Sequence, residues 1–121
     1  MILLDISVWI DHLLHGEPRL IEFLADGQVL VHPFVVAEIA LGSLTRRAVV
    51  IEVLEALPQA PIALHHEVMT LIEYERLFGL GIGYIDVHLL ASARLSGAPL
   101  WTRDRRLHAA ADRLGVAAGE G

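Results

Sequence analysis

Short apolar runs alternate along the chain with longer stretches in which apolar and polar positions follow a helical period. The runs Met1 to Leu4, Gln28 to Val31, Ile62 to Leu64 and Leu100-Trp101 have the length and composition of buried strands. The helical period predicts helices over about residues 8–14, 17–25, 33–44, 46–57, 65–78, 84–96 and 105–114, with a glycine-rich turn over 79–83. This alternation predicts an α/β fold with a central, mainly parallel β-sheet flanked by α-helices.

The length of 121 residues suits one domain, so we expect a single domain over 1–121 with a frayed tail at Gly119 to Gly121. A hydrophobic fraction of 55% and a mean hydropathy of +0.55 are high for a small domain. No apolar run approaches the roughly 18 residues of a membrane-spanning helix, and the apolar N-terminus is too short for a signal peptide. We therefore expect a cytoplasmic protein with no membrane segment, whose apolar surface makes a homodimer or partner interface.

Four carboxylates interrupt or end apolar runs and need a common explanation. An ionised carboxylate in apolar surroundings costs several kcal/mol or more unless it is paired, hydrogen-bonded or bound to a metal. Two of the four follow predicted strands directly and two lie on predicted helices: Asp5, Asp104, Glu38 and Asp86. Because the ligand crevice of an open parallel sheet lies outside the carboxyl ends of its strands, we expect these four side chains to converge there.

The absence of cysteine narrows the chemistry of such a cluster. Without thiolates, only Asp, Glu and His remain as strong side-chain metal ligands. Carboxylate oxygens suit hard cations such as Mg²⁺ and Mn²⁺, which can lower the pKa of a bound water and stabilise a leaving oxygen at phosphorus. The cluster therefore favours phosphodiester hydrolysis.

Each acid also has a structural interpretation. Asp5, Asp86 and Asp104 lie near predicted helix starts, where Asp is a favoured cap. Glu38 gains little from capping, and its alternatives are a solvent-facing side chain or an ion pair with Arg46 or Arg47. We favour the ligand interpretation for all four.

Four segments resemble, in order, the successive motifs of PIN-domain nucleases, and VapC-type toxins of bacterial toxin–antitoxin pairs in particular. They are residues 2–11 (ILLDISVWID), 36–42 (VAEIALG), 83–93 (GYIDVHLLASA) and 100–107 (LWTRDRRL). The resemblance covers nearly the whole chain, although any one motif alone is weak. One departure stands after the first aspartate, where Ile6 replaces a common threonine.

The resemblance implies a PIN-like fold and an endoribonuclease that depends on Mg²⁺ or Mn²⁺. It implies a catalytic acid set with two supporting hydroxyls: Asp5, Glu38, Asp86 and Asp104, supported by Ser7 and Thr102. We expect three of the acids, Asp5, Asp86 and Asp104, to dominate metal binding. Relatives of this kind are commonly dimers held inactive by a VapB-type antitoxin, so we expect an RNA substrate, a cognate antitoxin and a homodimer.

The net charge of −6 argues against a general polyanion binder. All nine basic residues are arginine, however, and three of them surround Asp104: Arg103, Arg105 and Arg106. Arginine presents a planar fork that suits phosphate oxygens, so this cluster is a candidate RNA phosphate contact, with a solvated helix face as the alternative. Asp11 is interpreted as an ordinary surface charge.

Other functions are weaker matches. A haloacid-dehalogenase-like phosphatase needs a second acid two positions after the first, where this chain has Ser7, and a receiver domain needs a lysine, which this chain lacks. The main alternative is a catalytically silent PIN-like subunit that acts as a binding or assembly module. Loss of a site acid would indicate that alternative, and all four are present.

Overall fold

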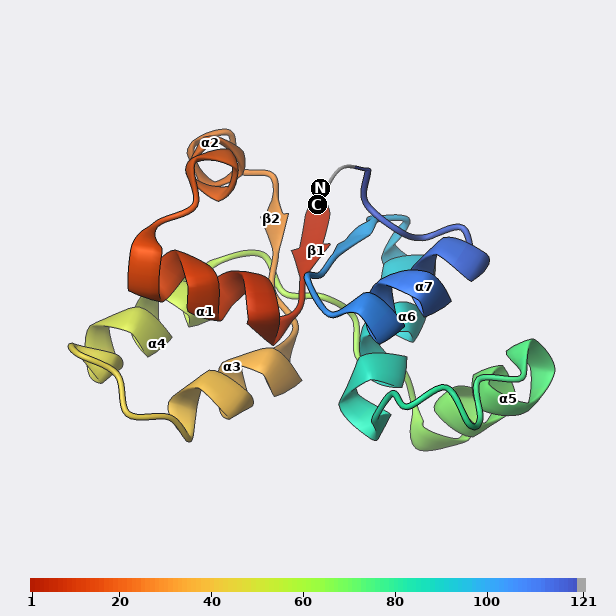
Figure 1. Ribbon diagram of the computed structural model, residues 1–121. Helices are drawn as coiled ribbons and strands as arrows, with labels where there is room; N and C mark the ends of the chain where they lie inside the picture. The colour runs from red at the N-terminus through yellow and green to blue at the C-terminus, as the bar shows by residue number, and fades with distance from the viewer. Residues whose placement is uncertain (120–121) are drawn as a thin grey trace.

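A computed structural model describes residues 1–119 of the chain, so Glu120 and Gly121, at the end of the predicted tail, lie outside the described residues. Seven helices and three strands are present in this part of the chain (Figure 1). In chain order they are β1 (Ile2–Leu4), α1 (Ile6–His15), α2 (Pro18–Ala25), β2 (Val29–Leu30), α3 (Pro33–Ala40), α4 (Arg47–Ala56), α5 (His65–Glu75), α6 (Tyr84–Ser96), β3 (Leu100–Trp101) and α7 (Arg105–Arg113).

The three strands form a parallel sheet in the order β2-β1-β3, which confirms the predicted α/β fold. The central strand β1 pairs Ile2 with Val29 on one side and Leu3 with Leu100 on the other. Single parallel bridges extend the sheet at both edges, from Val31 to Gln59 and from Leu100 to Ala117. The helices pack around these strands, with α1 to α4 on one side of β1 and α6 and α7 on the other in the view of Figure 1.

The predicted strand at Ile62 to Leu64 is wrong. The chain pairs with the β2 edge earlier, where Val31 N–H donates to Pro58 and Ala60 N–H donates to Val31. Proline has no N–H to donate, and Pro61 follows directly, so the pairing ends after one bridge. Ile62 and Leu64 are instead 49% and 59% exposed.

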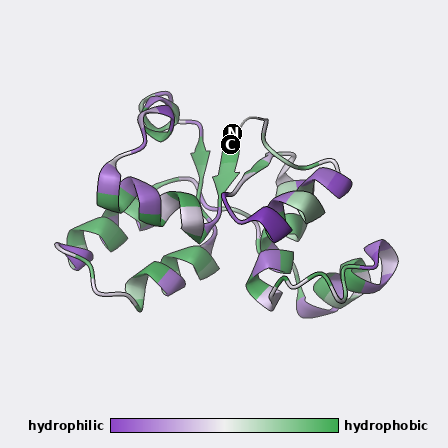
Figure 2. Cartoon of the chain, viewed as in Figure 1, coloured by the Kyte–Doolittle hydropathy of each residue, from purple (hydrophilic) through white to green (hydrophobic). Residues whose placement is uncertain are grey.

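The strands are hydrophobic throughout, as Figure 2 shows, because both faces of a parallel sheet are covered by helices. Helix α6 packs against β3 and is buried from Val87 to Ala93. Two helices are shorter than predicted: α3 ends at Ala40, just before Gly42, and α5 ends at Glu75, where Arg76 adopts a left-handed conformation with φ 54°. Within residues 1–119 no helix is long and apolar enough to cross a membrane.

Candidate active site

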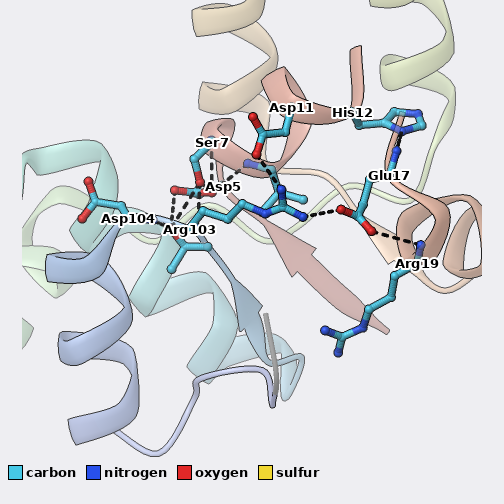
Figure 3. Close-up of polar contacts among 10 residues, drawn as sticks. Asp5, Ser7, Asp11, His12, Glu17, Arg19, Arg103 and Asp104 are labelled. Atoms are coloured by element: carbon cyan, nitrogen blue, oxygen red, sulfur yellow. Dashed lines mark hydrogen bonds and ion pairs between the residues drawn. The ribbon is translucent and has the colours of Figure 1, made fainter. Parts of the chain in front are cut away.

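Asp5 is the centre of the site, one residue beyond the end of β1. It is 4% exposed, and hydrogen bonds reach both of its carboxylate oxygens. Oδ1 accepts from Ser7 Oγ (2.6 Å), Ser7 N (3.1 Å) and Val8 N (3.4 Å), while Oδ2 accepts from Thr102 Oγ1 (2.6 Å). These bonds cap α1 and fix the orientation of the carboxylate (Figure 3).

The segment that follows β3 supplies the second hydroxyl. Thr102 is buried, and its Oγ1 accepts from the backbone N–H of Asp104 (3.0 Å) while donating to Asp5. Ser7 acts in the same way, since its Oγ accepts from the backbone N–H of Arg103 (2.9 Å) and donates to Asp5. Each hydroxyl therefore uses its single proton on Asp5, and both hydroxyls join the ends of β1 and β3.

Asp5, Glu38 and Asp86 influence one another through their charges. Burial is the main reason that the pKa of Asp5 is raised, the hydroxyl and backbone bonds oppose it, and the charge of Asp86 on α6 adds to it. The pKa of Glu38 on α3 is also raised, first by burial and then by the charges of Asp86 and Asp5. Three of the predicted acids, from three separate elements, are thus close enough to repel one another.

Asp104 lies on the other side of Thr102 and begins α7. Its Oδ1 accepts from the backbone N–H of Leu107 (2.9 Å), and the side chain is exposed. Thr102 links it to Asp5 through two hydrogen bonds. The structure thus brings Asp104 next to the site but does not bury it among the other acids.

Capping and site membership coexist in three of the acids. Asp5 caps α1, Asp104 caps α7, and Asp86 Oδ2 accepts from Gly83 N–H (2.9 Å) at the start of α6. A carboxylate has about four lone-pair positions, so these bonds leave acceptor capacity on each. Glu38 forms no ion pair within residues 1–119, and Arg47 donates instead to the carbonyl of Ala40 (2.7 Å).

The donor set suits a hard divalent cation. Asp5, Glu38 and Asp86 offer carboxylate oxygens, and in the described part of the chain none of the three is neutralised by a salt bridge. No three histidine, aspartate or glutamate side chains among residues 1–119 are arranged to hold a metal by themselves. The fit to a cation such as Mg²⁺ rests on the chemistry of the donors, because Mg²⁺ prefers carboxylate oxygens, usually takes few protein ligands and completes its shell with water and substrate oxygens.

Arg103 has a different environment from the one the sequence suggested. Its guanidinium forms ion pairs with Asp11 (2.6 Å) and Glu17, which joins the loop after β3 to α1 and to the start of α2 (Figure 3). It also lies over the ring of Trp101, 5.8 Å from the centroid. The sequence interpretation missed Asp11 and Glu17 because no local spacing links them to a residue about 90 positions away.

Two histidines are buried beside the site. His88, two residues after Asp86, is 2% exposed, and neither ring nitrogen has a partner within residues 1–119. His32 caps α3 by accepting from the N–H of Phe34 (3.0 Å), and its ring lies 6.0 Å from that of His88. Burial lowers the pKa of both, that of His32 to about 4. Both rings therefore belong to the packed interior of the protein.

The model of the PIN domain matches residues 2–113, which include all four acids and both hydroxyls. The chain belongs to the PIN-domain family. Ribonuclease VapC32 of Mycobacterium tuberculosis is 49% identical over 121 residues, which cover 99% of this chain and 98% of the relative. The predicted family is thereby confirmed.

Two solved structures share this PIN fold. A structure of FitAB bound to an IR36 DNA fragment contains a chain that superimposes with a TM-score of 0.63 and 25% identity, covering 97% of this chain and 92% of that one. FitAcB from Neisseria gonorrhoeae gives a TM-score of 0.62 with 26% identity, covering 97% of this chain and 95% of the other. The helices and strands described above are therefore arranged as in known members.

Proposed function

We propose that this protein is a metal-dependent endoribonuclease that hydrolyses RNA phosphodiester bonds as the toxin of a VapBC-type toxin–antitoxin pair. Family membership and the ribonuclease relative that matches over nearly its whole length support the reaction class. The observation that carries the proposal is the convergence of Asp5, Glu38 and Asp86, whose charges raise the pKa of Asp5 and Glu38 at the carboxyl end of the sheet.

The proposed cofactor is Mg²⁺ or Mn²⁺, held by Asp5 and Asp86 with Asp104 at the edge of the site. When bound, such a cation supplies Lewis-acid stabilisation of negative charge that develops on phosphate oxygens. Ser7 and Thr102 hold the Asp5 carboxylate in one orientation through two 2.6 Å hydrogen bonds. Outer hydrogen bonds of this kind typically contribute 10–100-fold to metal affinity or activity.

Glu38 is the proposed general base. Its raised pKa makes its carboxylate a better proton acceptor than an ordinary surface glutamate, and a base is most effective when its pKa lies near the working pH. In this role an oxygen of Glu38 takes the proton from the water that attacks phosphorus. Within residues 1–119 no arginine forms a salt bridge with Asp5, Glu38 or Asp86, so their negative charges are free to bind a cation.

The proposed partners follow from the same assignment. An RNA strand is the substrate, a VapB-type antitoxin is the inhibitor, and a second copy of the chain completes a homodimer in the cytoplasm. Large exposed apolar side chains such as Leu41 and Tyr74, 89% and 82% exposed, are suited to such protein contacts.

The test is cleavage of labelled tRNA and single-stranded RNA by the purified protein with Mg²⁺ or Mn²⁺. We expect cleavage that EDTA abolishes and that Asp5→Asn and Asp86→Asn reduce at least 100-fold, while Asp112→Asn, an exposed aspartate on α7, leaves it unchanged. Circular dichroism would establish that the variants fold. Full activity in a folded Asp86→Asn protein would refute the site, and metal binding without cleavage of any RNA would favour the silent PIN-like subunit.

A further inference from the structure

A hollow of about 320 Å³ lies beside α7 and is not part of the acidic site. Six residues line it: Leu80, Arg105, Arg106, Ala109, Ala110 and Arg113. The α7 residues recur at positions that share one helix face, and Leu80 comes from the loop between α5 and α6. The hollow is therefore lined by apolar side chains and by three arginines, and its volume lies at the lower end of ligand pockets, about 300–1,000 Å³.

Two of these arginines are held by their surroundings. Arg113 Nη2 donates to the backbone carbonyls of Glu75 and Arg76 at the end of α5. Arg106 packs directly over Gly81, where a Cβ atom would lie only 2.7 Å from Arg106 Nη1. Gly81 thus leaves room for Arg106, so the guanidinium is placed by the loop and not only by its own helix.

Arg105 and Arg106 also carry uncompensated charge. The salt bridges within residues 1–119 use Arg94 and Arg103, and neither Arg105 nor Arg106 joins one. The chain as a whole has 15 acidic and 9 basic residues. Figure 2 shows the first turn of α7 as strongly hydrophilic. The hollow therefore presents free positive charge in an otherwise acidic molecule, and an anionic ligand complements it.

The hollow shares Arg105 with a second cavity that reaches Asp104, at the edge of the acidic site. This second cavity, of about 380 Å³, is lined by Thr102, Arg103, Asp104, Arg105 and His108. Arg105 belongs to both cavities, and Thr102 is the residue whose hydroxyl holds Asp5. A strand of nucleic acid whose scissile phosphate lies at the acids can therefore continue over Arg105 to the arginine-lined hollow.

We propose that this hollow is a nucleotide subsite for the RNA strand next to the scissile bond, a proposal that rests on the proposed function. Arg105 and Arg106 take a phosphate, because the guanidinium fork matches phosphate oxygens. The base lies on Leu80 and Ala109 beside the guanidinium planes, on which unstacked bases pack readily. Arg103 is excluded from this role, since Asp11 and Glu17 occupy its guanidinium.

The first experiment measures binding without catalysis. A fluorescent single-stranded RNA oligonucleotide is titrated with protein in EDTA, and anisotropy is followed from low to high salt. We expect Arg105→Gln/Arg106→Gln to bind at least tenfold more weakly at low salt, with the slope of log K against log[salt] reduced by about 0.7 per lost phosphate contact. Arg46→Gln is the matched control, because Arg46 is exposed and lies before α4 on the opposite side of the sheet.

The second experiment separates this proposal from the proposed function. With Mg²⁺, the double variant should raise KM at least tenfold and leave kcat within twofold, since the acids are intact. Equal binding and equal KM in both variants would overturn the subsite while the nuclease stands. If no RNA is cleaved, selective loss of binding in the double variant still supports the subsite. As a competitor, a glutamate-rich peptide is added at the same concentration of negative charge as the RNA. Displacement of the RNA by this peptide would overturn the nucleotide subsite in favour of an acidic protein ligand.

Discussion

Asp5 is almost fully buried and Glu38 is half-buried, and burial is the main cause of the raised pKa of each carboxyl. A carboxyl with a higher pKa in the folded than in the unfolded state favours folding at low pH. That contribution is lost as the pH rises through the folded pKa, so at neutral pH both ionised groups oppose folding. Enzymes commonly retain such destabilising groups because the site needs them.

We therefore predict that Glu38→Gln makes the protein more stable and less active. Its free energy of unfolding should exceed that of the wild type at pH 7, and the difference should shrink towards pH 4, where the wild-type carboxyl is protonated. Cleavage should fall at least 100-fold, since the amide cannot accept the proton. Urea unfolding at several pH values measures the first effect. Glu22→Gln, at an exposed position on α2, should change neither quantity, and a destabilised Glu38→Gln protein would contradict the prediction.

His32 changes the stability with pH in the opposite direction to the two carboxyls. Its pKa of about 4 lies below the usual 6.5 because of burial, so the unfolded state binds the proton more tightly. The contribution of His32 to stability is fully present above pH 6.5 and falls by about 1.4 kcal/mol per pH unit down to pH 4. We predict that His32→Asn, which keeps an acceptor for the N–H of Phe34, reduces this loss.

The measurement is the free energy of unfolding of the variant and the wild type at pH 7 and at pH 5. Because both proteins contain the same carboxyl groups, the difference between them reports on His32. The exposed His66→Asn serves as the control and should keep the wild-type pH dependence. An identical dependence in His32→Asn would show that His32 is not the group responsible.

The sequence predicted the acids better than their surroundings. Asp5, Glu38 and Asp86 could be found because each interrupts an apolar run, and the structure brings them together. The ion pairs of Arg103 with Asp11 and Glu17 could not, because they join segments about 90 residues apart and leave no local pattern. For the same reason the uncompensated charge of Arg105 and Arg106 emerged only from the structure.

The helices and strands were predictable wherever one physical signal dominated. β1 and β3 are short, wholly apolar runs, and α6 follows a glycine loop with Asp86 in its first turn. The segment 62–64 was misassigned because its apolar content suggested burial, whereas Pro58 and Pro61 limit pairing with β2 to Gln59. The availability of backbone N–H donors, rather than hydropathy, therefore determines where the chain pairs with the edge of the sheet.

The Thr102 hydroxyl is one of the two that hold the loop after β3. Thr102→Val keeps the buried shape but removes the donor to Asp5 and the acceptor for the N–H of Asp104. We predict a 10–100-fold loss of activity or metal affinity and a stability loss of about 1–3 kcal/mol. Cleavage assays over a range of Mg²⁺ concentrations and thermal unfolding would measure both. Thr45→Val, in the exposed loop before α4, should be neutral, and full activity in Thr102→Val would remove the hydroxyl from the mechanism.

The glycine loop between α5 and α6 offers a test of Arg106 that keeps its charge. Gly81 and Gly79 both have positive φ, 74° and 72°, but only the Cβ of an alanine at 81 would meet Arg106. We predict that both Gly81→Ala and Gly79→Ala lose about 1–2 kcal/mol of stability, and that only Gly81→Ala weakens RNA binding. Thermal unfolding and RNA anisotropy distinguish the two effects. Equal RNA affinity in both variants would mean that the loop does not place the guanidinium.

The arrangement of the chain as a whole explains why its site lies where it does. Asp5 and Asp104 cap the N-termini of α1 and α7, and Asp86 lies in the first turn of α6, so the positive ends of these helix dipoles favour the three carboxylates. The two sides of the sheet then each supply part of the site, α1 and α3 from one and α6 and α7 from the other (Figure 1). The distances between the acids therefore depend on how the helices pack on the sheet. A change that loosens this packing should impair catalysis before secondary structure is lost.

The outer surface of α5 carries large apolar side chains that are exposed in the described part of the chain. Tyr74 is exposed near its C-terminal end, Met69 is exposed five residues before it, and Phe78 follows the helix. Apolar and aromatic side chains gathered in this way are typical of protein interfaces, and a stable one buries about 800 Å² per partner. We predict that the isolated protein is a homodimer at micromolar concentration and that Tyr74→Glu shifts it to a monomer.

Sedimentation velocity over a range of concentrations measures this directly. Leu14→Glu, at an exposed apolar position on α1, is the matched control and should remain dimeric if α5 forms the interface. Dimers in both variants would show that the interface does not include α5. A monomeric wild type would contradict the homodimer and favour a different protein as the partner of this apolar surface. Tyr74 is not one of the site residues, so the monomeric Tyr74→Glu variant should keep its metal affinity. If the dimer is needed to complete the site, cleavage should be lost in Tyr74→Glu and kept in Leu14→Glu.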